Sequence, residues 1–220
     1  MSMDHEPDHA SDTEALEALE LLYATTLYTL RESRKHMLRQ YAVDSEACLL
    51  EKIRSGELDE HPAYEHYLGA LIIDQARTHV RAQAIRQLHG EAGDTLAETS
   101  VHLMLSDKIE EHYAHRLSEP IRVSQDALLL FFDSGLMVEV RYFSCDEYSI
   151  GWCWGDALCR IDTAPVHTGC ATFPHHLHDD ADLAADDPIT EPGTPCWINF
   201  SALIDLLLLD PLLENRRANT

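Results

Sequence analysis

Apolar residues in the first ninety positions recur every three or four residues, which is the spacing of an amphipathic helix. The clearest series is Leu16, Leu19, Tyr23, Leu27 and Leu30. It predicts a helix over about 12–40, with the capping-box pattern of residues 11–14 at its start. A shorter helix is predicted over 45–54, stopped by Gly56, and a third from Pro62 to Gly90. We therefore expect an antiparallel helical hairpin with a small helix between its arms.

The hydrophobic period changes to two after Ser118, as in strands with one buried face. Residues 136–143 and 148–154 alternate between apolar and polar positions. The segments 133–135 and 155–156 carry turn residues, so 120–162 is predicted to form an antiparallel meander of four or five strands. A loop-rich stretch is expected over 163–195. A last amphipathic helix through Leu209 would be capped by Asn199 or Ser201.

These patterns predict an α+β fold: a helical N-terminal module followed by an antiparallel β-sheet domain with a C-terminal helix. We expect a disordered leader at 1–10, a helical module of unknown role at 11–95, and a connecting segment at 96–118. Within that segment, 107–116 has the character of one more helix. The sheet domain would occupy 119–213.

The charge balance limits the classes of partner. The chain has 39 acidic and 16 basic residues, a formal net charge of −23, and the part from 119 onward holds seventeen acids against five arginines. Such a surface repels a phosphate backbone unless a local pocket or a partner holds it. No secretory signal, membrane span or Cys-x-x-Cys pair is visible, which favours a cytoplasmic protein with reduced thiols and no membrane partner.

The concentrated chemistry of the chain is a histidine cluster that comprises His167, His175, His176 and His178. Histidine changes its charge near neutral pH and ligates metals, so it suits both proton transfer and metal binding. A structural interpretation also stands, in which these imidazoles hold a long loop in place through hydrogen bonds to backbone carbonyls.

Three segments in order carry a resemblance to a known family. They are Tyr148-Ser149-Ile150-Gly151-Trp152, Arg160-Ile161-Asp162-Thr163-Ala164-Pro165-Val166-His167 and Thr172-Phe173-Pro174-His175-His176-Leu177-His178. Residues 119–213 thereby resemble the TumE family of toxin–antitoxin-associated proteins. The chain has Thr163, Val166 and Leu177 where the family usually has Asn, His and Lys. The resemblance implies a small α+β toxin-like protein with an antitoxin protein as partner, and RNA cleavage is an extrapolation from it.

Metal-independent endoribonuclease chemistry is the first functional hypothesis. His167, His176 and His178 would exchange protons with a ribose hydroxyl and a leaving oxygen, and His175 belongs to the same candidate set. Arg160 would stabilise the charge of the phosphorane, and Asp162 would orient an imidazole. RNA or the ribosome would then be the partner, and no cofactor would be needed.

A divalent metal such as Zn²⁺ is the alternative cofactor hypothesis, because His176 and His178 lie on one side of an extended strand. His167 or Asp162 would be a third ligand. A non-catalytic protein that forms a homodimer or docks a partner through its helical module is a further alternative, as is a module that covers the cluster like a built-in antitoxin. Proton transfer requires the rings of residues 167, 176 and 178 to lie within about 10 Å of one another.

Overall fold

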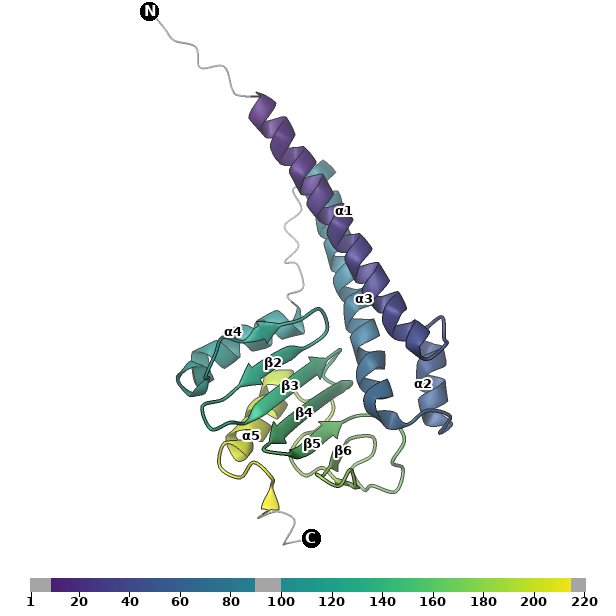
Figure 1. The fold of residues 1–220 in the computed structure, drawn as a ribbon, viewed down its shortest axis with the longest axis vertical. Coiled ribbons are helices and arrows are strands. Elements are labelled where there is room, and N and C mark those ends of the chain that lie inside the picture. Colours follow the sequence, from purple (N-terminus) through teal and green to yellow (C-terminus); the bar gives the residue numbers. More distant parts are fainter. Residues whose placement is uncertain (1–8, 90–99, 215–220) are drawn as a thin grey trace, which may run out of the picture.

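The computed structural model describes residues 9–89 and 100–214, and its architecture is the predicted α+β arrangement. A helical region comes first, a seven-stranded antiparallel sheet follows, and a helix closes the described chain. Figure 1 shows the helical hairpin projecting from one side of the sheet domain. Among the described helices, none combines the length and apolar character needed to cross a bilayer.

The helical module consists of α1 (His9–Gln40), α2 (Glu46–Arg54) and α3 (Glu60–His89). The arms α1 and α3 pack along each other, and α2 fills the space at their connected end. Ser45 caps α2 by accepting a hydrogen bond from the backbone N–H of Cys48. The backbone of His61 and Pro62 is not helical, so Glu60 is separated from the regular part of α3 by a kink.

The sheet is a simple meander in which each strand pairs with the next one along the chain. Its strands are β1 (Arg122–Val123), β2 (Leu128–Phe131), β3 (Met137–Tyr142), β4 (Tyr148–Trp154), β5 (Ala157–Asp162), β6 (His176–His178) and β7 (Ala184–Asp186). Alternation places the buried residues Val138, Val140 and Tyr142 on one face. That face forms the main core with α4 (Val101–Tyr113) and α5 (Cys196–Leu207).

The opposite face of the sheet meets the helical module at β3, β4 and the loop after β5. A second core forms there, in which Ala164 and the side chain of Val166 pack among residues of α2 and α3. Tyr64 of α3 is buried, and its hydroxyl lies 2.9 Å from the Thr163 hydroxyl. The loop that carries the first histidine of the cluster is therefore fixed by the helical module.

Several predicted boundaries need correction. The stretch 163–195, expected to be a loop, contains β6 and β7, whereas the meander predicted over 120–162 is confirmed with its five strands β1 to β5. Residues 9 and 10 belong to α1, while residues 1–8 of the expected leader and the predicted linker at 91–95 lie outside the described residues. The connecting segment holds α4 and a 3₁₀ turn, η1 (Ala114–Arg116), so its helix begins earlier than expected.

The C-terminal helix begins at Cys196 after Pro195, and neither Asn199 nor Ser201 is its cap. The Asn199 side chain has a different role. Its amide donates to the Glu191 carbonyl at 2.8 Å, and its carbonyl accepts from the Glu191 N–H at 3.1 Å. The buried amide therefore holds the preceding loop against the helix. A capping rule, which considers only the residues around the helix start, does not predict this contact.

Candidate metal centre

Four side chains from two parts of the fold converge on one point. The Nε2 atom of His167 lies 2.6 Å from Glu60 Oε2, that of His176 2.9 Å from Glu60 Oε1, and that of His178 3.3 Å from the same carboxylate. The three imidazole ring centroids are 4.5 to 5.1 Å apart. Four potential ligand atoms, one from each residue, lie within 4.8 Å of one another. This set is called the histidine–glutamate cluster below.

Strand geometry and helix packing bring these side chains together. His176 and His178 alternate along β6 and project from the same face, because residues two apart in a strand share a side. His167 comes from the loop after β5, which packs on α2 and α3. Glu60 enters from the helical module, at the kinked start of α3. The site thus bridges the two halves of the chain.

The second ring nitrogen of two histidines identifies the tautomer. Nδ1 of His176 lies 2.9 Å from the Pro174 carbonyl oxygen, which can only accept, so Nδ1 carries the proton. Nδ1 of His178 lies 3.5 Å from the Asp182 backbone carbonyl oxygen and 3.0 Å from its carboxylate, and since both oxygens can only accept, this Nδ1 also carries the proton. In the neutral form of each ring, Nε2 then presents a bare lone pair to the Glu60 carboxylate. Lone pairs directed at an anion need a cation or a proton between them.

The electrostatics of the cluster agree with this need for positive charge. Burial would raise the pKa of Glu60, but the hydrogen bonds from His176 and His178 outweigh it and hold that pKa well below its ordinary value. Burial would lower the pKa of His176, yet its hydrogen bond to Glu60 and the charge of Asp162 raise it. Without another cation, the raised pKa of His176 therefore favours a proton between its ring and the ionised Glu60 carboxylate.

Arg160 and Asp162 border the cluster on the same sheet face. Asp162 is fully buried; its Oδ1 lies 3.4 Å from Nε2 of His176, and its Oδ2 accepts from Arg160 Nε at 2.6 Å. Burial first, and then the charge of Glu60, raise the pKa of Asp162 to about 6. The pairing places Arg160 opposite His178 and Asp162 opposite His176, so both predicted supporting residues lie beside the imidazoles.

The sixth predicted residue, His175, is separate from this set. It precedes β6, and strand alternation turns it away from the face that carries His176 and His178. Its Nδ1 is buried without a hydrogen-bond partner among the described residues. The structure therefore brings together His167, His176 and His178 with Arg160 and Asp162, and leaves His175 outside.

Glu60 was not among the residues that the sequence singled out. It lies 107 positions before His167, and an acidic residue at a helix start, two positions before a proline, is ordinary helix chemistry. The contact is formed only when the helical module packs on the sheet. Three clustered histidines indicate that an acidic partner lies nearby, but the sequence alone does not identify which of the 39 acidic residues it is.

The fold and the cluster define the class of protein as a two-part α+β protein with a histidine–glutamate site built across its two parts. In comparisons with known proteins, the model of a family described as "Uncharacterized protein MJ0235 family" matches residues 9–93, the stretch that includes the helical module and Glu60. No curated protein and no solved structure matches the chain.

Proposed function

We propose that this protein binds one divalent transition-metal ion through Glu60, His167, His176 and His178, and that Zn²⁺ is the ion that fits best. The observation that carries the proposal is the pair of fixed tautomers, which direct the Nε2 lone pairs of His176 and His178 toward a carboxylate. A histidine that donates its other ring N–H to a carbonyl or carboxylate is the usual arrangement around a bound metal.

The donor set fits zinc chemistry. Imidazole nitrogens and a carboxylate oxygen bind Zn²⁺ at about 2.0–2.2 Å, which gives a tetrahedral edge of about 3.3 Å. Of the three nitrogen–oxygen separations, the 3.3 Å of His178 matches that edge, whereas the 2.6 and 2.9 Å of His167 and His176 are hydrogen-bond lengths that would have to lengthen around an ion. Imidazole also suits copper, iron and nickel, so the metal content of the purified protein decides the identity of the ion.

A metal-dependent hydrolase is the second candidate function, because His178 also lines a groove of about 660 Å³ that is large enough for a substrate. A divalent ion held here would supply Lewis-acid chemistry for hydrolysis. His167 has a side chain that is 35% exposed, which gives solvent a path to the cluster. Arg160, which lines the same groove, would orient a polar group of the substrate beside His178.

The toxin-like ribonuclease suggested by the TumE resemblance uses the same residues without a metal. In that hypothesis Glu60, contributed by the helical module, blocks the imidazoles from a ribose, since all three Nε2 atoms face its carboxylate. Metal binding accounts for this arrangement more directly, because it uses Glu60 as a ligand instead of requiring its removal.

The test is the metal content of the protein purified without chelator, compared among the wild type and two variants. Wild type should contain about one Zn²⁺ per chain, and the double variant His176→Ala, His178→Ala should contain none. His175→Ala is the matched control, because this neighbouring imidazole lies outside the cluster, and it should keep its zinc. Equal metal content in the double variant and the wild type would refute the site.

Expression in a bacterial host tests the toxin hypothesis separately. Growth arrest that disappears in the same double variant but persists in His175→Ala would support an active site at the cluster. Growth arrest that persists in the double variant would exclude these histidines as its cause, whatever the metal content.

A further inference from the structure

Two cysteines that lie 51 positions apart in the sequence meet at the start of α5. Cys145 belongs to the connection between β3 and β4, and Cys196 is the first residue of α5. Both are free thiols, and their sulfur atoms are 2.9 Å apart. A disulfide bond is about 2.03–2.05 Å long, so a shift of the two sulfurs by about 0.9 Å would bring them to bonding distance.

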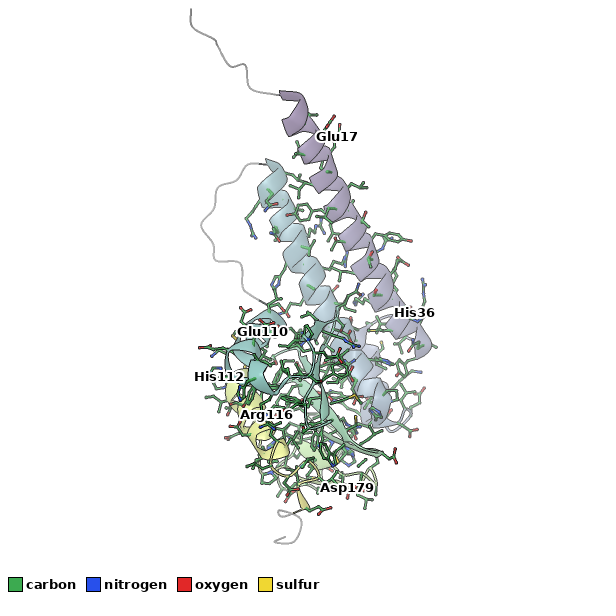
Figure 2. The ribbon with its side chains drawn as sticks, turned by 60° about the vertical axis from the view of Figure 1, so that its left-hand side comes forward. Glu17, His36, Glu110, His112, Arg116 and Asp179 are labelled. Atoms are coloured by element: carbon green, nitrogen blue, oxygen red, sulfur yellow. The ribbon has the colours of Figure 1, made fainter. Side chains whose placement is uncertain are left out.

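Other contacts already join the segments that carry the two thiols. The Gly193 backbone N–H donates to the Cys145 carbonyl at 3.1 Å, which connects the loop before α5 to the β3–β4 connection. On that connection, the Glu147 carboxylate accepts a hydrogen bond from the Tyr67 hydroxyl of α3 at 3.0 Å. Helix α5 packs beside α4, and Figure 2 shows the two helices together near the labelled His112. The pairing of the thiols is therefore part of the tertiary packing.

The two thiols differ in their access to solvent. Cys196 is 2% exposed and belongs to the main core, whereas Cys145 is half-buried and packs against that core. Burial, and then the hydrogen bond and charge of Cys145, raise the pKa of the Cys196 thiol to about 12. Because the thiolate is the nucleophilic form of cysteine, Cys196 reacts poorly with an oxidant in solution. Cys145 is therefore the thiol that a small oxidant reaches first.

A buried hydroxyl group without a partner lies near the pair. Tyr142, at the end of β3, is 2% exposed, and its hydroxyl has no hydrogen-bond partner among the described residues. Burial, and then the charges of Tyr148 and of the two cysteines, raise the pKa of this hydroxyl well above its ordinary value, so it remains a donor. A buried donor is normally paired. An oxygen atom added to the Cys145 sulfur would accept the missing hydrogen bond.

We propose that Cys145 and Cys196 are a peroxide-responsive pair that closes into a reversible disulfide bond. Hydrogen peroxide oxidises the Cys145 thiol to a sulfenic acid and releases one water, and the Tyr142 hydroxyl donates to the new oxygen. The Cys196 sulfur then attacks the Cys145 sulfur, the sulfur–oxygen bond breaks, and the oxygen leaves as a second water with the Cys196 proton. Two thiols and one peroxide thus give one disulfide and two waters. A small thiol reverses the change by thiol–disulfide exchange.

The full-length protein, reduced and kept in EDTA, is treated with equimolar hydrogen peroxide, and its cysteines are located by peptide mass mapping. Two of the six thiols should be lost, and one disulfide should join Cys145 to Cys196 until dithiothreitol is added. Cys196→Ser should stop at a sulfenic acid on Cys145, which dimedone traps. The matched control Cys153→Ser changes another half-buried cysteine, which lines the groove, and should form the disulfide like the wild type.

The role of the Tyr142 hydroxyl is measured in the Cys196→Ser background. Tyr142→Phe removes only this hydroxyl and should slow dimedone labelling of Cys145 about tenfold, the effect of losing one hydrogen bond to the reacting oxygen. An unchanged rate would exclude the hydroxyl from the reaction. The oxidised wild type should melt about 5–15 °C above its reduced form, because the bond closes a long loop. Equal melting temperatures would overturn the inference that the bond ties α5 to the sheet.

Three outcomes would overturn the pair itself: six free thiols after peroxide treatment, a disulfide between other cysteines, or dimedone labelling of Cys196→Ser at a residue other than Cys145. None of the ligands in the histidine–glutamate cluster is a cysteine, and the measurements are made in EDTA. The result therefore does not depend on the metal proposal, and either proposal can fail while the other stands.

Discussion

Replacing Glu60 with glutamine tests whether the helical module contributes a ligand to the metal centre. The substitution keeps the size of the side chain and removes its charge, and Glu60 is largely buried with 11% of its side chain exposed. The neutral amide would bind a divalent cation more weakly than a carboxylate does, while the three imidazoles of the sheet domain would remain. The variant therefore separates a site with four ligands from one that lies within the sheet domain alone.

The expected magnitude follows from linkage between binding and folding. A ligand that binds only the folded state stabilises it by RT ln(1 + [L]/Kd), which is about 2.7 kcal/mol when free zinc is 100 times Kd. If loss of the carboxylate raises Kd about 100-fold, the same free zinc stabilises Glu60→Gln by only about 0.4 kcal/mol. For a chain of 220 residues each kcal/mol shifts the melting temperature by about 2–4 °C, so zinc should raise it by about 5–10 °C in wild type and by about 1–2 °C in the variant.

Calorimetric melting at a buffered free-zinc concentration is the assay, and the zinc-induced shift is measured against each protein's own chelated state. The variant is also less stable than the wild type without metal, because it lacks the charge-assisted contacts of the Glu60 carboxylate with His176 and His178. Subtracting each protein's chelated melting temperature removes this difference. Glu57→Gln is the matched control, because Glu57 belongs to the same module and its side chain is 61% exposed. An equal zinc-induced shift in wild type and Glu60→Gln would exclude Glu60 as a ligand.

Two further predictions concern stability. Burial lowers the pKa of His102 to about 4, and its Nε2 accepts a hydrogen bond from the Tyr142 N–H, so the folded state requires a neutral ring. The pKa of His102 in the folded state lies below its value of about 6.5 in the unfolded state. The neutral ring therefore contributes fully to the free energy of unfolding above pH 6.5, and this contribution falls by about 3 kcal/mol as the pH drops toward 4. Urea unfolding across this range should show a shallower acid loss in His102→Gln, and equal slopes would contradict the assignment. Tyr64→Phe removes the buried hydroxyl contact with Thr163, and urea unfolding should show a loss of about 1 kcal/mol, whereas no change would mean that this contact does not help join the two parts.

The elements that the sequence predicted are those whose pattern is local. The helical arms follow from apolar spacing over tens of residues, and the central strands from the alternation that buries Val138, Val140 and Tyr142. Hydrophobic periodicity did not predict the short strands β6 and β7, because a segment of three residues is too short to show a repeating pattern. The strand character of β6 comes from its pairing with β5, a contact between distant segments.

In the candidate site, too, the sequence predicted the residues that lie close together along the chain and missed the contacts that depend on tertiary packing. His167, His176, His178, Arg160 and Asp162 could be grouped from the sequence because they lie within nineteen positions of one another. The turn of His175 away from the cluster depends on where β6 begins, and the boundaries of short strands are poorly predicted from sequence. Glu60 depends on the docking of α3 against the loop after β5.

The division of ligands between the two parts of the chain has a functional consequence. The sheet domain contains the three imidazoles, whereas the segment that matches the MJ0235 family model contains the carboxylate. A sheet domain with three histidines alone leaves a coordination position for solvent or substrate, as catalytic zinc sites do. In the proposed metal site, Glu60 would fill that position from the helical module, so any movement of α3 relative to the sheet would change the coordination of the ion. The packing of Tyr64, Ala164 and Val166 between the modules would therefore control access to the metal as well as the stability of the fold.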